Sequence, residues 1–162
     1  MYLKDYLNQF EGKKIKMFVD MDGVIVDYVV GSTDDFDKRR PLYTSISKIQ
    51  EIYEAGNVEL YILSITRMNK GLEEKNIWLD NYAPMFKKEN RVIISREAND
   101  FKASAELKAE YISNLERDGS VFIVIDDDPR VLKAIKDSNK DVALLKDTAL
   151  VDWNILNILG TG

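Results

Sequence analysis

Cysteine and histidine are both absent from this chain of 162 residues. Without cysteine the protein has no disulfide, no thiolate nucleophile and no zinc-thiolate or iron-sulfur site. Without histidine it lacks the commonest general base and the commonest transition-metal ligand. Any catalysis must therefore use Asp, Glu, Lys, Tyr, Ser or Thr, and we expect any bound metal to be a hard ion with oxygen ligands, such as Mg²⁺.

Long apolar runs and an excess of positive charge are also missing. No apolar run approaches the roughly 20 residues that span a bilayer, and the amino-terminal stretch MYLKDYLNQFEGKK does not have the pattern of a signal peptide. We therefore expect a cytoplasmic protein without a membrane partner. The net charge of −5 argues against a surface built to bind nucleic acid nonspecifically, although it leaves room for one local basic groove.

The length of the chain suits a single domain over residues 1–162, which would bury about two-thirds of its unfolded surface. Short β-branched runs predict strands at residues 15–19, 59–63, 91–94, 121–125 and, more weakly, 142–145. Helical spacing of apolar residues predicts helices around residues 46–53, 72–79 and 105–115, and a further one that begins at Pro129. The tail VDWNILNIL indicates a packing helix. This alternation predicts an α/β fold: a doubly wound, Rossmann-like, mostly parallel sheet with helices on both faces.

Polar side chains follow three of the predicted strands. In sheets of this kind ligands bind beyond the carboxyl ends of the strands. Carboxylates gathered at that edge repel one another unless a cation neutralises them, and oxygen ligands favour Mg²⁺. Magnesium held by carboxylates in turn indicates a phosphate substrate. The residues at this edge are Asp20 and Asp22 after the first strand, Ser64 and Thr66 after the second, and Asp126, Asp127 and Asp128 after the fourth.

Each of these motifs taken alone has a plainer structural interpretation. An aspartate after a strand often forms a turn or caps a helix, because its side chain accepts backbone N–H bonds. We assign that role to Asp128, since Asp128 and Pro129 are typical of an N-cap followed by the first helical residue. The combination of motifs at one edge favours a functional site.

Four short segments together resemble the motifs of the haloacid-dehalogenase-like phosphohydrolases. In chain order they are FVDMDGVI, YILSITR, KAEYI and VIDDDPRVL. The resemblance extends from about residue 15 to about residue 145. The IDDDP form and the EKNIWL segment are similar to deoxyribonucleotidase-like members, and the phosphatase half of polynucleotide kinase-phosphatases is similar as well.

The resemblance implies a role for each matching residue of the first two motifs. Asp20 would be the nucleophile that forms an aspartyl-phosphate. Asp22 would be the general acid and then the general base, with a pKa raised by the crowding of acidic groups, and Gly23 would let the chain turn there. Ser64 would donate a hydrogen bond to the phosphoryl group. The residues assigned to substrate binding are Gly23, Thr66 and Arg67.

The third and fourth motifs would supply a lysine and the remaining metal ligands. The lysine offsets the charge of the nucleophile and the phosphate; Lys102 and Lys108 are both candidates, and the KAEYI pattern favours Lys108. Asp126 would bind Mg²⁺ together with the carboxylate of Asp20 and the backbone carbonyl of Asp22. Asp127 would hold a metal-bound water or orient the lysine.

These roles predict a magnesium-dependent phosphomonoester hydrolase acting on a nucleotide or similar small phosphate. Three alternatives stay open: a polynucleotide 3′-phosphatase, which would bind a nucleic-acid end; a phosphotransferase with the same motifs; and a noncatalytic acidic domain that binds a metal or a partner. The spans between the motifs are too short for a separate cap domain. We therefore expect an open site, roofed at most by residues 28–41, whose Lys38, Arg39 and Arg40 either steer an anionic substrate or form a solvated turn.

Overall fold

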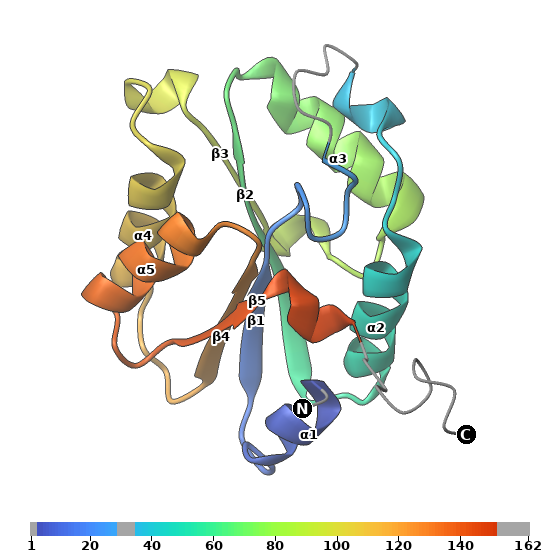
Figure 1. Ribbon diagram of the computed structural model, residues 1–162, viewed down its shortest axis with the longest axis vertical. Coiled ribbons are helices and arrows are strands. Elements are labelled where there is room, and N and C mark those ends of the chain that lie inside the picture. Colours follow the sequence, from blue (N-terminus) through green and yellow to red (C-terminus); the bar gives the residue numbers. More distant parts are fainter. Residues whose placement is uncertain (1–2, 29–34, 152–162) are drawn as a thin grey trace, which may run out of the picture.

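The computed structural model describes residues 3–28 and 35–151. Its centre is a five-stranded, entirely parallel sheet with the order β3-β2-β1-β4-β5 (Figure 1). The doubly wound α/β fold predicted from the sequence is confirmed. The strands are β1 (Ile15–Val19), β2 (Val58–Thr66), β3 (Arg91–Ser95), β4 (Val121–Asp126) and β5 (Ala143–Lys146).

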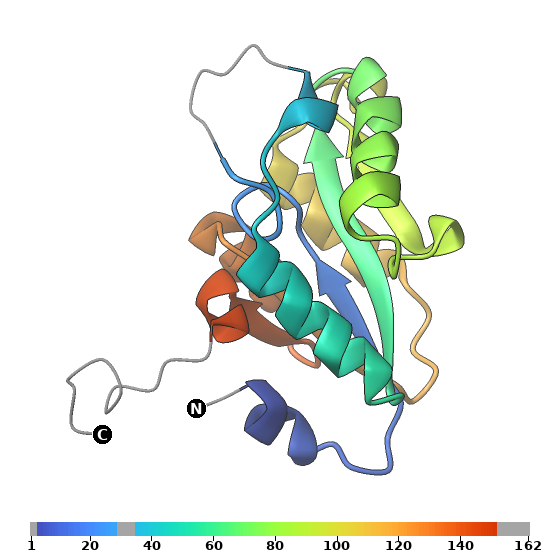
Figure 2. The ribbon, with the colours of Figure 1, turned by 90° about the vertical axis from the view of Figure 1, so that its right-hand side faces the viewer.

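Helices cover both faces of this sheet. The helices α2 and α3 lie on one side, and α4 and α5 lie on the other (Figures 1 and 2). The α-helices are α1 (Leu3–Asn8), α2 (Tyr43–Glu54), α3 (Lys70–Tyr82), α4 (Ser104–Asn114) and α5 (Pro129–Ser138), and short 3₁₀ turns include η1 (Phe36–Lys38). None of the helices in the described part of the chain has the length and apolar composition needed to cross a bilayer.

Alternating side chains of β1 explain why both faces must be covered. Ile15, Met17 and Val19 are buried in the cluster that contains residues of α1, α2 and α3. Phe18 belongs to the opposite cluster, with residues of α4 and α5. A strand that is apolar on both sides is stable only between two layers of helices.

The structure differs from the sequence-based prediction in several places. Strand β2 continues to Thr66, so Ser64 and Thr66 lie within the strand and do not follow it. Helix α1 was not predicted. Ile77 lies within the helix predicted at residues 72–79 from its apolar residues, but it is exposed, because the buried face of α3 carries Gly71, Lys75, Trp78 and Leu79. The predicted tail helix lies outside the described residues.

The chain order of the strands creates a crevice at the centre of the sheet. From β1 the chain continues outward to β2 and β3, and then crosses to β4 and β5 on the other side of β1. The point where the order reverses lies between β1 and β4, and such a point is the usual ligand site of an open α/β sheet. Within the described residues, η1 and α2 are the helical elements between β1 and β2, which agrees with a minimal cap.

Candidate active site

Three carboxylates meet where β1 and β4 end. The parallel register pairs Val19 with Ile125, and the backbone N–H of Asp20 donates to the carbonyl of Ile125 at 3.0 Å. Asp20 and Asp126 are therefore neighbours at the reversal point of the sheet. One carboxylate oxygen from each of Asp20, Asp126 and Asp127 lies within 4.8 Å of the others.

Lys108 connects two of these carboxylates. It lies on the buried face of α4 and is 4% exposed at its side chain. Its Nζ is 2.9 Å from Asp20 Oδ1 and 2.6 Å from Asp126 Oδ2. The other candidate, Lys102, is exposed and pairs with Glu110 at 3.3 Å. Of the two lysines, the structure therefore brings Lys108 to the carboxylates.

Burial and charge set the protonation of this group. Burial raises the pKa of Asp20 to about 6, against the attraction of Lys108, and the charge of Asp126 adds to the increase. Burial also raises the pKa of Asp126 and of Asp127. For Lys108, burial acts to lower the pKa, but the charges of Asp20 and Asp126 outweigh it and raise the pKa above its usual range. The cluster thus has more negative charge than one lysine can balance.

The donor set fits the metal expected from the sequence. Three carboxylate oxygens at short mutual distances suit a hard divalent cation such as Mg²⁺, which uses oxygen ligands and usually retains several waters. The aspartate that follows the cluster has a different role. Asp128 is the N-cap of α5 and accepts from the backbone N–H of Arg130 at 2.9 Å, so the predicted cap is confirmed.

Gly23 lies directly against the cluster. Its φ is +76°, in the left-handed region that favours glycine, and a Cβ built there would lie 2.2 Å from Asp127 Oδ2. We expect Gly23→Ala to displace Asp127, which should weaken Mg²⁺ binding about tenfold or more as well as destabilise the fold. Gly12 is the matched control, because its φ is +80° and nothing lies within 4 Å of its Cβ position.

Isothermal titration with Mg²⁺ and thermal unfolding of both variants would check this expectation. Gly12→Ala should lose only the roughly 1–2 kcal/mol of left-handed strain and keep its Mg²⁺ affinity. Equal Mg²⁺ affinity in the two variants would show that Asp127 does not depend on Gly23.

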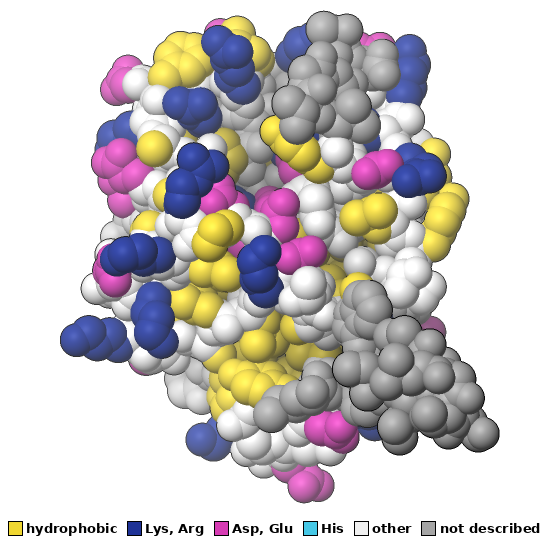
Figure 3. Space-filling view, in the orientation of Figure 1, with side chains coloured by type: hydrophobic (Ala, Val, Ile, Leu, Met, Phe, Trp, Pro, Cys, Tyr) yellow, Lys and Arg dark blue, Asp and Glu magenta, His cyan; other side chains and the backbone are white. Residues whose placement is uncertain are grey.

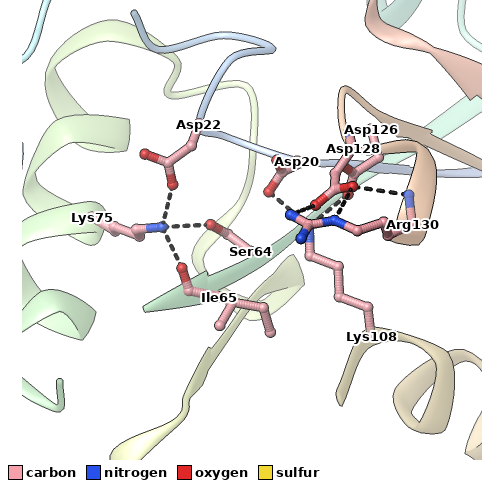
Figure 4. Close-up of polar contacts among 9 residues, drawn as sticks. All are labelled: Asp20, Asp22, Ser64, Ile65, Lys75, Lys108, Asp126, Asp128 and Arg130. Atoms are coloured by element: carbon pink, nitrogen blue, oxygen red, sulfur yellow. Dashed lines mark hydrogen bonds and ion pairs between the residues drawn. The ribbon is translucent and has the colours of Figure 1, made fainter. Parts of the chain in front are cut away.

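The Asp22 side chain is held apart from the carboxylate cluster (Figure 4). Its Oδ1 accepts from Arg39 at 2.9 Å, and its Oδ2 accepts from Nζ of Lys75 at 2.8 Å. The sequence analysis expected other carboxylates to crowd around Asp22, but in the structure its side chain contacts two cations.

Ser64 is fully buried and its Oγ points toward Lys75 (Figure 4). The Lys75 Nζ donates to this Oγ at 2.7 Å. In this structure Ser64 is therefore covered by a lysine at the position where the sequence analysis expected a phosphoryl oxygen.

Thr66 and Arg67 lie farther along the same edge. The Thr66 hydroxyl donates to the backbone carbonyl of Met68 at 3.2 Å, and the Thr66 side chain packs where a Cβ on Gly71 would be. The Arg67 side chain is exposed. Both residues line a cavity beside the carboxylates and do not touch the cluster itself.

Two adjoining cavities open at this edge. The first, of about 500 Å³, contains the carboxylate cluster and Lys108. The second, of about 320 Å³, is lined by the end of β2, the start of α3 and η1. Asp22, Arg39 and Ile65 line both cavities, so they form the wall between them. In Figure 3 acidic side chains gather around a hollow near the middle of this face, with lysine and arginine side chains around it.

Sequence analysis did not identify Lys75 as a site residue. Its signal was available, because Lys75 has the helical spacing of the buried residues Gly71, Trp78 and Leu79. A charged residue on an apolar helix face is buried only when it has partners. The contact between Arg39 and Asp22 was also not predicted.

Comparison with known proteins gives matches among solved structures only. No family model matches the sequence, and no curated protein matches it either. A chain of the Pnkp1/Rnl/Hen1 complex is similar at a TM-score of 0.64 and 13% identity, over 84% of this chain and 46% of that chain. This chain thus spans less than half the length of that chain.

Two phosphatases are also similar. D,D-heptose 1,7-bisphosphate phosphatase from B. bronchiseptica, complexed with magnesium and phosphate, has a TM-score of 0.57 and 12% identity, over 92% of this chain and 99% of its own. Class C acid phosphatase from Bacillus anthracis, with tungstate bound, has a TM-score of 0.56 and 17% identity, over 94% of this chain and 78% of its own. At such identities the likeness establishes the fold alone: the chain has the fold of the haloacid-dehalogenase-like phosphatases.

Proposed function

We propose that this protein is a magnesium-dependent phosphomonoester hydrolase that works through an aspartyl-phosphate and acts on a nucleotide or similar small phosphate. The observation that carries the proposal is the contact of Lys108 with both Asp20 and Asp126 at the reversal point of the sheet. This contact places a buried cation beside a carboxylate that is nearly buried but still lines an open cavity. The fold of the structural neighbours, among them two phosphatases, supports the same reaction class.

The residues divide the reaction between them. Asp20 attacks the phosphorus atom in line with the leaving oxygen, and the bond between the phosphorus and that oxygen breaks. Lys108 neutralises charge on Asp20 and on the incoming phosphoryl group. Asp22 gives a proton to the leaving oxygen and later takes one from the water that hydrolyses the aspartyl-phosphate. Ile65 and Thr66, at the end of β2, line the cavities at this edge.

Mg²⁺ bound in this site would neutralise charge on the phosphoryl oxygens. Its protein ligands would be the carboxylates of Asp20, Asp126 and Asp127 and the backbone carbonyl of Asp22. The first three carry the ligand atoms that lie within 4.8 Å of one another. Arg67 and Thr66 line the adjoining cavity and would contact the rest of the substrate.

A polynucleotide end is the second candidate substrate. One structural neighbour belongs to an assembly described as an RNA repair complex, and both cavities open to solvent with exposed side chains at their rims, such as Tyr28 and Met68. A phosphotransferase would use the same groups with an alcohol in place of water. A noncatalytic metal-binding domain has no need of a lysine buried between two of the carboxylates, and this contact argues against that alternative.

A phosphate-release screen tests the proposal and separates these candidates. The panel contains nucleoside 5′- and 3′-monophosphates, sugar phosphates and oligonucleotides with a 3′- or 5′-phosphate, each assayed with Mg²⁺ and with a chelator. Phosphate release from nucleotides with Mg²⁺ but not with the chelator supports the proposal. A strong preference for an oligonucleotide end supports the second candidate. Transfer of phosphate to an added alcohol in place of water supports a phosphotransferase. No release or transfer from any substrate refutes the proposed activity.

Lys108 and Lys102 offer a matched pair of substitutions on the same chain segment. We expect Lys108→Met to lower kcat at least about a hundredfold, because the nucleophile loses the cation that offsets its charge. Lys102→Met should change kcat less than about twofold, because its side chain is exposed and pairs only with Glu110.

Stability provides an independent check on the same pair. Lys108→Met leaves Asp20 and Asp126 buried without their cation, so its melting temperature in chelator should fall at pH 8. Part of that loss should be recovered at pH 5, below the pKa of about 6 of Asp20, where the carboxyl takes up a proton. If both variants keep full activity, Lys108 has no catalytic role.

A further inference from the structure

Lys75 is a buried cation in the EKNIWL segment, to which the sequence analysis assigned no role. Its side chain is 4% exposed, on the face of α3 that packs against the sheet. The Nζ contacts Asp22 Oδ2 at 2.8 Å, Ser64 Oγ at 2.7 Å and the carbonyl oxygen of Ile65 at 2.8 Å (Figure 4). The ring of Phe36 lies 4.8 Å from the same nitrogen. One ammonium group therefore connects the loop after β1, the end of β2 and η1.

The three hydrogen bonds use all the donors of Lys75. An ammonium group has three N–H bonds and no acceptor, and each one has a partner within 2.8 Å. No donor is left for a phosphoryl oxygen. Lys75 consequently acts on other side chains and not on the substrate.

The hydrogen bond from Lys75 to Asp22 bears directly on the proposed chemistry, because Asp22 is the proposed general acid. Asp22 lines both cavities, so it can contact a leaving oxygen that departs toward the second cavity from a phosphorus atom attacked by Asp20. A carboxylate has about four acceptor positions, and Lys75 and Arg39 occupy one on each oxygen. The remaining positions can face the leaving group only while the carboxylate is held in this orientation.

We propose that Lys75 is a positioning residue that holds the Asp22 carboxyl group at the boundary of the two cavities, where its acid form can protonate the leaving group. This role rests on the proposed phosphatase function. The Arg39 side chain is 18% exposed and the Lys75 side chain is 4% exposed. Lys75 is therefore the buried contact of Asp22, and Arg39 is the outer one. The Trp78 indole, one turn farther along α3, donates to the backbone carbonyl of Arg39 at 2.9 Å, so the same helix also contacts the backbone that carries the outer cation.

The test compares two phosphomonoesters whose leaving groups differ in their need for a proton. p-Nitrophenolate leaves as an anion, whereas the alkoxide of an alkyl phosphate must be protonated as it departs. The measured quantity is kcat/KM, because it reports the steps up to departure of the leaving group and excludes later hydrolysis of the intermediate. The variants are Lys75→Met and the control Lys70→Met, an exposed lysine of α3 that lines the second cavity.

We expect Lys75→Met to lower kcat/KM for the alkyl phosphate by about 10²-fold or more, which is the usual contribution of a general acid. For p-nitrophenyl phosphate the decrease should stay below about fivefold, and Lys70→Met should leave the ratio between the two substrates unchanged. Equal decreases for both substrates would show a merely structural role and overturn the proposal. The alkyl phosphate is the best alkyl substrate of the phosphate-release screen, so if the wild-type protein releases phosphate from no substrate of that screen, the proposed function fails and this role fails with it.

A second variant covers the case in which Lys75→Met does not fold. The double variant Asp22→Asn with Lys75→Met removes both charges of the pair, which is much less costly than leaving one of them buried alone. If Lys75 acts through Asp22, the double variant has the same ratio between the two substrates as Asp22→Asn. An additional tenfold selective loss on the alkyl phosphate would show that Lys75 acts elsewhere.

Discussion

Asp20→Asn is expected to lower kcat by at least about three orders of magnitude while the protein remains folded. The substitution is nearly isosteric, but an amide cannot form the aspartyl-phosphate, and loss of a covalent catalyst normally has an effect of this size. The amide oxygen can still accept the hydrogen bond from Lys108 that the carboxylate accepts at 2.9 Å. Steady-state phosphate release in Mg²⁺ would measure the effect.

The same variant should be more stable than the wild type when metal is absent. At pH 8 Asp20 is ionised in both the folded and the unfolded protein, and its raised pKa of about 6 means that the folded state disfavours this charge. Removal of the charge should raise the melting temperature in chelator by several degrees, since about 1 kcal/mol corresponds to roughly 2–4 °C in a domain of this size. At pH 5 the difference should shrink, because the wild-type carboxyl is then protonated.

These two measurements separate the nucleophile from a structural residue. Lost activity with increased stability is the result expected of a group placed for chemistry against the preference of the fold. If Asp20→Asn retains more than about one part in a hundred of the wild-type rate, Asp20 is not the nucleophile.

Dependence of the phosphatase activity on Mg²⁺ is the second prediction with a large expected effect. A chelator should abolish activity, Mg²⁺ should restore it, and Ca²⁺ should restore it poorly because of its longer and less regular coordination. Below pH 6 the apparent Mg²⁺ affinity should fall, because protons compete for Asp20, whose pKa is about 6, and for Asp126 and Asp127, whose pKa values are also raised.

Asp126 and Asp128 make the matched pair for this prediction. Asp126→Asn should weaken Mg²⁺ binding at least tenfold, as measured by titration calorimetry, because one carboxylate of the cluster loses its charge. Asp128→Ala should leave binding nearly unchanged and lower the melting temperature slightly, because Asp128 caps α5 and pairs with Arg130. Full activity in excess chelator would contradict the whole metal assignment.

Several features of this protein follow from local sequence. The apolar runs at β1 and β4 are buried on both faces, so they predict central strands of a parallel sheet, and the structure places them side by side. Once those strands are adjacent, the aspartates that follow them must meet at one edge. Asp20, Asp126 and Asp127 are therefore predictable from the sequence, and so is the capping role of Asp128, which depends on its immediate neighbours.

The partners of Asp22 were decided only by tertiary structure. Lys75 is 53 residues from Asp22 in the chain, and the contact depends on which face of α3 packs against the sheet. The apolar residues of the helix did not reveal that face, because it carries Lys75 beside Trp78, whereas Ile77 is exposed. The same long-range packing buries Ser64 beneath a lysine. Lys108, by contrast, was already favoured over Lys102 by the KAEYI pattern, and the structure brings it to the carboxylates.

What the sequence by itself determined was the order of strands and helices and the acidic edge they create, because periodicity and turn chemistry act between near neighbours. Which cations contact Asp22 was decided by the packing of α3 and of the segment that carries Arg39. The pairing of a buried charge depends on the distance between atoms that only the folded chain brings together, and no local pattern records that distance.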